Sequence, residues 1–203
     1  MIREMIRASV DRHVPSAGAA TTPFDGVELF RVEAPFERMP GIYSPCVCVL
    51  VAGEKVVYVE DSRHVFNEDR YVCATLPTPT LADVSGASPE SPLLGLLIHF
   101  DNNMISRLIL EMQAAYGTPP TTDKSRNGFG TAVRDERLDL ALANLLELLD
   151  DPPAAQVLGA GRLREVLFAI LRGEAGDRLR SDFGGAPALA TTLAHVHAHI
   201  GED

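Results

Sequence analysis

The chain has 203 residues, 46% of them hydrophobic and 23% charged, and its formal net charge is -10. This length and composition are typical of one folded domain, or of one domain with a short helical appendage, and they exclude bulk disorder. The acidic balance argues against direct binding to nucleic acid, because phosphate contacts need clustered Lys and Arg side chains.

The first 22 residues are expected to form an arm ahead of the main domain. Charged residues are mixed into the apolar positions of residues 1–7, which indicates a short helix or arm and not a signal peptide. The stretch of small residues at 16–22 is expected to be mobile.

Residues 23–100 are rich in short strands that are separated by turn residues. Apolar or alternating runs predict strands at residues 27–33, 46–52, 55–60, 64–66, 71–76, 80–85 and 93–100. Three prolines and Gly41 make residues 35–45 a loop or an edge. Both alternating faces of residues 46–51 are apolar, so this strand should be covered on both sides. Short strands at this spacing predict a sandwich or a small barrel.

From Asp101 onward the apolar period changes from two residues to about 3.6 residues. Asp101 is a good N-cap for a helix whose apolar positions run from residue 104 to residue 115. Residues 118–131 are polar and glycine-rich, which predicts a loop. A leucine-dense helix at 138–149 should end where residues 150–153 start the next helix.

The remaining segments continue this helical pattern to the end of the sequence. Residues 163–171 predict a further amphipathic helix that Gly173 ends. Gly184 and Gly185 indicate a linker, and residues 189–200 predict a last helix.

Cysteine usage and hydropathy indicate where the protein resides. The three cysteines form no C-x-x-C pair, which argues against a disulfide framework and favours a reducing cytoplasm. The sequence lacks an apolar run of the roughly 18 residues that a membrane span requires. We therefore expect a cytoplasmic protein with no membrane partner.

The order of these features resembles the N-terminal domain of AraC-type transcriptional regulators. The resemblance rests on Y-x-P at residues 43–45, an apolar strand that runs into A-G-x-K at residues 52–55, and a meander that ends before Pro77. Residues 164–180 resemble the helical tail of that domain, and residues 193–200 resemble the opening helix of the family's helix-turn-helix domain.

This resemblance implies an α+β fold, in which a cupin-like β-barrel (jelly-roll) is followed by a small set of α-helices. It divides the chain into an arm (1–22), the barrel (23–100), a helical dimerisation and packing segment (101–183), and a linker with the first helix of a truncated DNA-binding domain (184–203). It also implies a role in sensing a small molecule, in dimerisation, or in both. DNA would be bound only through a C-terminal domain that lies outside this sequence.

A cupin-fold enzyme, with or without a bound metal, is the alternative function. Cupin enzymes hold their metal with a His-x-His pair, because a stable site needs three or four converging ligands. The β region contains only His64 and His99 and no such pair, so a metal site there would need both of them and a cysteine. We therefore expect no catalysis, no metal and no cofactor.

Two other sets of residues have both a chemical and a structural interpretation. Cys46 and Cys48 lie on the same side of one strand and could sense redox state or metals, or simply be small buried hydrophobes. His195 and His199 are one helical turn apart, a spacing that can bind zinc or can belong to an ordinary helix.

The predicted barrel can be filled with side chains, or it can leave room for one small ligand. Polar groups on inward-facing residues would orient such a ligand, although a shift of one residue reverses the facing of a whole strand. The candidate ligand-binding residues are Tyr43, Cys46, Cys48, Leu50, Tyr58, Tyr71, Cys73 and His99.

The leucine-dense helix predicts a second function, because it is more apolar than one core contact requires. The alternative to ligand binding is a filled barrel that only dimerises. The residues expected at the interface of a homodimer are Leu138, Leu142, Leu145, Leu146 and Leu149.

Overall fold

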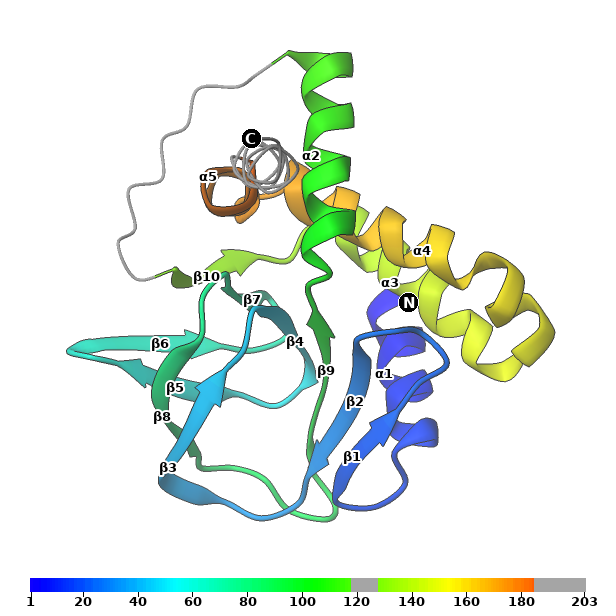
Figure 1. Ribbon diagram of the computed structural model, residues 1–203. Helices are drawn as coiled ribbons and strands as arrows, with labels where there is room; N and C mark the ends of the chain where they lie inside the picture. The colour runs from blue at the N-terminus through cyan, green and yellow to red at the C-terminus, as the bar shows by residue number, and fades with distance from the viewer. Residues whose placement is uncertain (118–127, 185–203) are drawn as a thin grey trace, which may run out of the picture.

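The protein is described by a computed structural model that covers residues 1–117 and 128–184. The strands in these residues form two antiparallel sheets (Figure 1). The larger sheet has six strands, in the order β1 (Gly18–Thr21), β2 (Val27–Val32), β9 (Leu93–His99), β4 (Cys46–Ala52), β7 (Arg70–Ala74) and β10 (Phe129–Val133). The smaller sheet has four, in the order β3 (Phe36–Tyr43), β8 (Thr78–Val84), β5 (Lys55–Val59) and β6 (Ser62–Phe66).

The chain crosses repeatedly between the two sheets. It passes from β2 to β3, back to β4, across again to β5 and β6, and then through β7, β8 and β9 on alternate sheets. This crossing pattern is typical of double-sheet jelly rolls. The predicted α+β fold with a cupin-like jelly-roll is therefore confirmed. Its strands form two distinct hydrogen-bonded sheets.

The two faces of β4 belong to two different hydrophobic cores. Cys48 and Leu50 lie in the core between the sheets, together with inward residues of the small sheet such as Val57. Val47 and Val49 lie in the larger core, which the six-stranded sheet shares with the helices. Every residue of β4 is buried, as the apolar pattern on both of its faces predicted.

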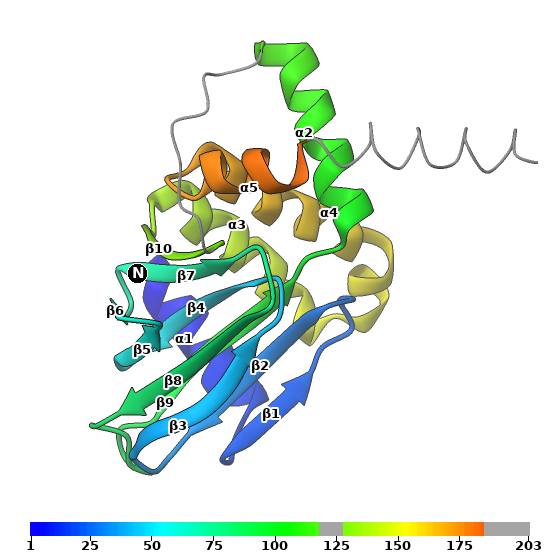
Figure 2. The same cartoon turned by 60° about the vertical axis from the view of Figure 1, so that its left-hand side comes forward.

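The helices gather on one side of the molecule, away from the small sheet (Figure 2). They are α1 (Ile2–His13), α2 (Asn102–Tyr116), α3 (Glu136–Glu147), a short 3-10 turn (Leu148–Asp150), α4 (Pro152–Arg172) and α5 (Gly176–Phe183). Aspartates begin three of them, because a carboxylate accepts from the free N–H groups of a first helical turn. Asp101 accepts from the backbone N–H groups of Asn103 and Met104 at 2.8 and 3.0 Å. None of the helices in the described ranges has the length and apolar character needed to cross a membrane.

A buried ionic cluster joins the N-terminal helix to the rest of the fold. The Arg134 side chain is only 1% exposed, pairs with Asp139 and donates through a second nitrogen to the carbonyl of Leu50 at 3.0 Å. Arg3 of α1 donates to the other carboxylate oxygen of Asp139 at 2.8 Å. Burial lowers the pKa of Arg134, since removal from water disfavours the charged form. The cluster ties α1 and α3 to the central strand of the larger sheet.

The structure corrects two predictions made for the ends of the larger sheet. The segment expected to be mobile contains β1, in which Gly18 lies opposite Arg31 of β2. The segment expected to be a loop contains β10, in which Phe129 lies opposite Ala74 of β7. Both strands are short and rich in small residues, so they have weak patterns of their own and depend on pairing with a longer neighbour. The strand predicted at residues 27–33 and the edge predicted at residues 35–45 correspond to β2 and to the edge strand β3.

The leucines that we expected at a dimer interface are instead packed inside the chain. Helix α3 packs against both α1 and α4, which cover the face that carries these leucines. The buried leucines are Leu138, Leu142, Leu145 and Leu146, and the half-buried Leu149 packs against the same core. The prediction that this leucine face is free for a partner is wrong, because the sequence does not reveal that α1 folds back onto α3.

Two other predictions fall on residues outside the described ranges. These are the helix at 189–200, with its His195 and His199, and residues 118–127 of the expected loop.

Candidate functional site

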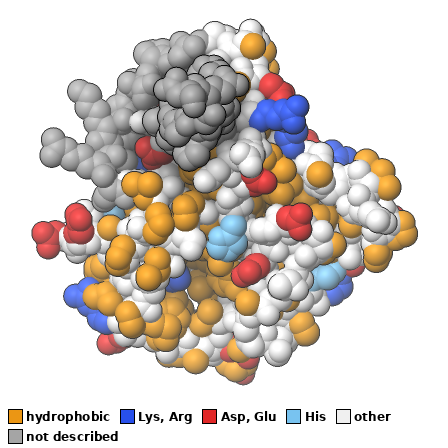
Figure 3. Space-filling view, viewed as in Figure 1, with side chains coloured by type: hydrophobic (Ala, Val, Ile, Leu, Met, Phe, Trp, Pro, Cys, Tyr) orange, Lys and Arg blue, Asp and Glu red, His pale blue; other side chains and the backbone are white. Residues whose placement is uncertain are grey.

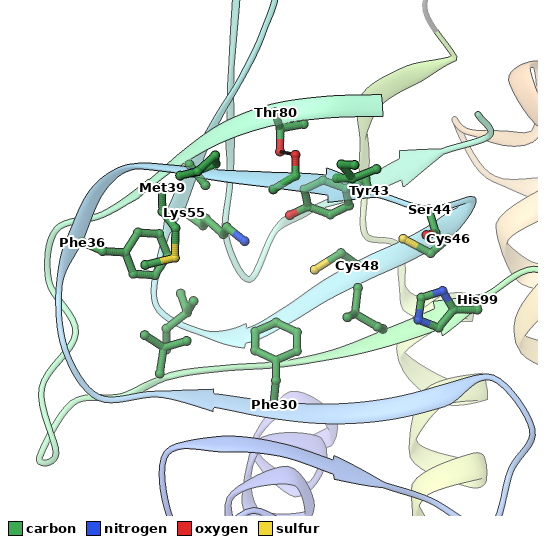
Figure 4. A pocket seen from close by; sticks show the side chains of 17 residues that line it. Phe30, Phe36, Met39, Tyr43, Ser44, Cys46, Cys48, Lys55, Thr80 and His99 are labelled. Atoms are coloured by element: carbon green, nitrogen blue, oxygen red, sulfur yellow. Dashed lines mark hydrogen bonds between the residues drawn. The ribbon is translucent and has the colours of Figure 1, made fainter. Parts of the chain in front are cut away.

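A cavity of about 300 Å³ lies between the two sheets, beside β3 (Figure 4). Its walls come from β2, β4 and β9 of the larger sheet and from β3, β5 and β8 of the smaller one. Most of the lining side chains are apolar, and they include Phe30, Val32, Phe36, Met39, Leu93 and Leu97. This volume is at the lower end of the range found for small-molecule sites.

The rim of the cavity is apolar as well. Figure 3 shows apolar side chains gathered over the small sheet on this face of the molecule. Met39 and Ile42 of β3 line the cavity and are also exposed, Ile42 to 72%. An apolar ligand can therefore approach the cavity across an apolar surface, with which its contact is favourable.

One end of the cavity is polar. Tyr43, at the end of β3, and Lys55, at the start of β5, direct their polar groups into it, and the Cys48 thiol lies close by (Figure 4). The Lys55 ammonium nitrogen is 5.4 Å from the centroid of the Tyr43 ring. The Tyr43 hydroxyl is buried without a well-formed hydrogen bond, and the adjacent Cys48 thiol is only a weak partner.

Burial keeps the acidic groups at this end protonated. It raises the pKa of the Cys48 thiol to about 11 and raises that of Cys46 further. It also raises the pKa of the Tyr43 hydroxyl well above its usual range, mainly because the charged phenolate would lose its hydration. All three groups are therefore neutral at pH 7, and the thiols are not reactive thiolates.

Four of the predicted ligand-binding residues line the cavity: Tyr43, Cys46, Cys48 and His99. Cys46 lies opposite His99 in the pairing of β4 with β9, so the register of the sheet brings these two together. Leu50 faces the same inter-sheet core but lies among packed side chains away from the cavity.

The other three predicted residues face away from the space between the sheets. Tyr71 and Cys73 lie in the helix-side core, because Val72 and Ala74 take the inward positions of β7. Tyr58 is on the outer face of the small sheet, where its hydroxyl donates to Asp83 at 2.8 Å. The predicted inward orientation of these residues is wrong by one position, the shift that reverses the facing of a strand.

The sequence prediction did not include Lys55, Thr80 and the phenylalanines of the cavity wall. Lys55 shares the inward face of β5 with Val57 and Val59, so the two-residue period of the strand was enough to predict that Lys55 faces inward. Phe36 and Met39 belong to a segment treated as a loop or an edge, which left their side chains without a predicted direction.

His64 is placed among aromatic rings rather than among metal ligands. Its ring centroid is 5.2 Å from that of Phe129, which in turn contacts the Tyr43 ring at 5.4 Å. Burial lowers the pKa of His64, and the charge of Arg178 adds to this effect. In residues 1–117 and 128–184, no three His, Cys, Asp or Glu side chains are grouped so that they could hold a metal ion.

The sequence from residue 23 to residue 178 matches the family described as AraC-type transcriptional regulator N-terminus. The chain belongs to this family. The match covers the smaller sheet, every strand of the larger sheet except β1, and helices α2, α3 and α4, and it includes every strand that lines the cavity. It agrees with the family that the sequence motifs resembled.

Two solved structures share little sequence identity with this chain. The chain is 9% identical to an apo form of a ToxT variant from Vibrio cholerae, with a TM-score of 0.47 over 71% of this chain and 53% of that one. For a second structure of ToxT from Vibrio cholerae the identity is 8% and the TM-score 0.39, over 67% of this chain and 57% of that one. The chain thus spans about half the length of these proteins. No curated protein matches the sequence significantly.

Proposed function

We propose that this AraC-type N-terminal domain is a sensor that binds a small effector molecule in the cavity between its sheets. The main observation that supports this proposal is the cavity itself, which is apolar along its walls and polar at one end. A filled sandwich that served only for packing would leave no such space, since protein cores are normally packed to crystal-like density. The family assignment favours this regulatory role over that of a cupin-fold enzyme.

The two faces of β4 and β9 suggest how occupancy would be transmitted. Cys48 and Leu97 line the cavity, whereas their neighbours Val47, Leu96 and Ile98 pack in the core shared with the helices. A ligand that favours one position of these strands would therefore also favour one packing of the helices. In the proposed function, the protein acts in the cytoplasm, and a DNA-binding domain outside this chain responds to the packing of the helices.

The proposal is tested by a thermal-shift screen with sugars, aromatic acids and aldehydes. A compound that binds the cavity should raise the melting temperature of the wild type but not of Ala82→Leu, whose larger side chain would occupy the cavity. Ala160→Leu, an equal enlargement at an exposed position of α4, is the matched control and should respond like the wild type. A flat response of the wild type across the panel would count against the sensor function.

We also propose that the domain works as a homodimer, although not through the buried leucines of α3. The large apolar side chains that remain exposed on α3 and α4 are Leu140, Val157 and Leu158, with Val157 exposed to 80%. Sedimentation velocity at micromolar concentration is the test, and a monomer at every concentration would defeat this part of the proposal.

A further inference from the structure

The charges at the cavity are the reverse of those in the chain as a whole. The chain has 28 acidic residues against 18 Lys and Arg, and only two of these cations are lysines, Lys55 and Lys124. Among the described residues that line the cavity, none is acidic and Lys55 is the cation. Lys55 is half-buried, so the partial loss of hydration makes its ammonium group favour an anionic partner in the cavity.

Nothing in the described part of the chain pairs with this ammonium group as a salt bridge would. No carboxylate in residues 1–117 or 128–184 lies within 4.0 Å of the Lys55 side-chain nitrogen. Its neighbours are the face of the Tyr43 ring and the protonated Cys48 thiol. The cation–π contact offsets part of the lost hydration, but it supplies no strong acceptor for the N–H donors of this half-buried ammonium group.

A hydroxyl group at the same end is fully buried and lacks an acceptor. The Tyr43 hydroxyl points into the cavity near Lys55 (Figure 4) and has no well-formed hydrogen bond. Buried polar groups are nearly always hydrogen-bonded in folded proteins, and exceptions call for an explanation. A ligand that supplies an anionic acceptor would satisfy Tyr43 and Lys55 together.

We propose that the cavity takes a small organic carboxylate. Its carboxylate oxygens accept hydrogen bonds from the Lys55 ammonium and the Tyr43 hydroxyl, and its apolar body packs against Phe30, Phe36 and Met39. This inference rests on the sensor function proposed above and specifies the class of effector. A single ammonium and one hydroxyl match a monoanion, whereas a phosphate dianion is usually held by several cations or backbone donors.

The test compares carboxylates with their neutral amides by isothermal titration calorimetry. The probes are octanoate with octanamide and 2-naphthoate with 2-naphthamide, so each pair keeps the apolar body and changes only the charge. A hydrogen bond to a charged group contributes about 1.5–3 kcal/mol, which is roughly a ten-fold to hundred-fold change in Kd. We expect at least one carboxylate to bind the wild type at least about ten-fold more tightly than its amide.

Variants separate the two donors from a general effect of charge. Lys55→Met should remove the preference for the carboxylate, Lys55→Arg should largely retain it, and Tyr43→Phe should weaken carboxylate binding more than amide binding. Arg63→Met, which removes an exposed cation from the neighbouring strand β6, is the matched control and should keep the wild-type preference. Melting temperatures of all variants without ligand show that the fold is retained.

The possible failures are distinguishable. Equal binding of carboxylate and amide, unchanged in Lys55→Met, would overturn the carboxylate proposal and leave the sensor function standing. Binding of sugars or aldehydes alone would do the same. Absence of binding by these probes and by the whole screening panel would refute both the effector class and the sensor function.

Discussion

Replacing Leu142 by Ala tests whether the leucine-dense face of α3 stabilises the monomer or forms a dimer interface. Leu142 is fully buried in the core that α3 shares with α1 and α4, whereas Leu140 on the same helix is 50% exposed. Both substitutions change helix propensity equally, because each exchanges Leu for Ala in the interior of α3. Leu140→Ala is therefore a control that differs from Leu142→Ala mainly in burial.

The expected free energies of unfolding differ by several-fold. Leu142→Ala removes buried methyl groups and leaves a cavity, which typically costs about 2–5 kcal/mol. Leu140 is half exposed and opens to solvent, so its loss should cost about 1 kcal/mol or less. In a domain of this size, about 3 kcal/mol corresponds to a fall of roughly 6–12 °C in melting temperature.

Urea unfolding followed by circular dichroism measures the stabilities, and sedimentation velocity measures assembly in the same samples. We expect Leu142→Ala to unfold at clearly lower urea concentration without a specific change in assembly. The reasoning would be refuted if Leu142→Ala kept wild-type stability and converted a dimer to a monomer. In that case the leucine face would contact a partner instead of α1 and α4.

Three further predictions concern the buried charge cluster, the packing of the sheet and the dependence of stability on pH. Asp139→Asn removes the anion that pairs with the buried Arg134 and should lower stability by about 3–5 kcal/mol in urea unfolding; a loss below about 1 kcal/mol would show that Arg134 does not depend on it. Gly95→Ala would place a Cβ 2.7 Å from the carbonyl oxygen of Val49 in the adjacent strand, and should cost about 1–3 kcal/mol through overpacking, with wild-type stability as the contradicting result. Burial lowers the pKa of His64 in the folded protein from its ordinary value of 6.5. As pH falls, the unfolded chain therefore takes up a proton on His64 before the folded protein does. The contribution of His64 to stability is present above about pH 6.5 and is lost as pH falls through the pKa of the folded state. His64→Phe should flatten the fall in urea midpoint between about pH 7 and about pH 5, and an unchanged pH profile would contradict the assignment.

Local sequence patterns predicted most of the framework of this protein. The apolar run at residues 46–52 predicted a strand covered on both sides, which corresponds to β4. Asp101 predicted the start of α2, because a side-chain carboxylate caps a helix using only neighbouring backbone groups. The motif at residues 43–45 and the order of the strands indicated the family, which the match over residues 23–178 confirms. These features depend on interactions between residues close together in the chain, so the sequence alone determines them.

Only the tertiary structure decided which face of each strand and helix is buried, and against what. Tyr71 and Tyr58 were expected to face the space between the sheets, but Tyr71 of β7 faces the helix-side core and Tyr58 of β5 faces the outside of the small sheet. The leucines of α3 were expected to be free, but α1 folds back from the other end of the sequence to cover them. Strand alternation places Lys55 on the inward face of β5, but only the folded structure showed that its ammonium nitrogen lies 5.4 Å from the centroid of the Tyr43 ring, across the intervening strand β8. These outcomes depend on contacts between residues far apart in the sequence, and because a strand or helix pattern is nearly the same in either packing, local patterns do not distinguish them.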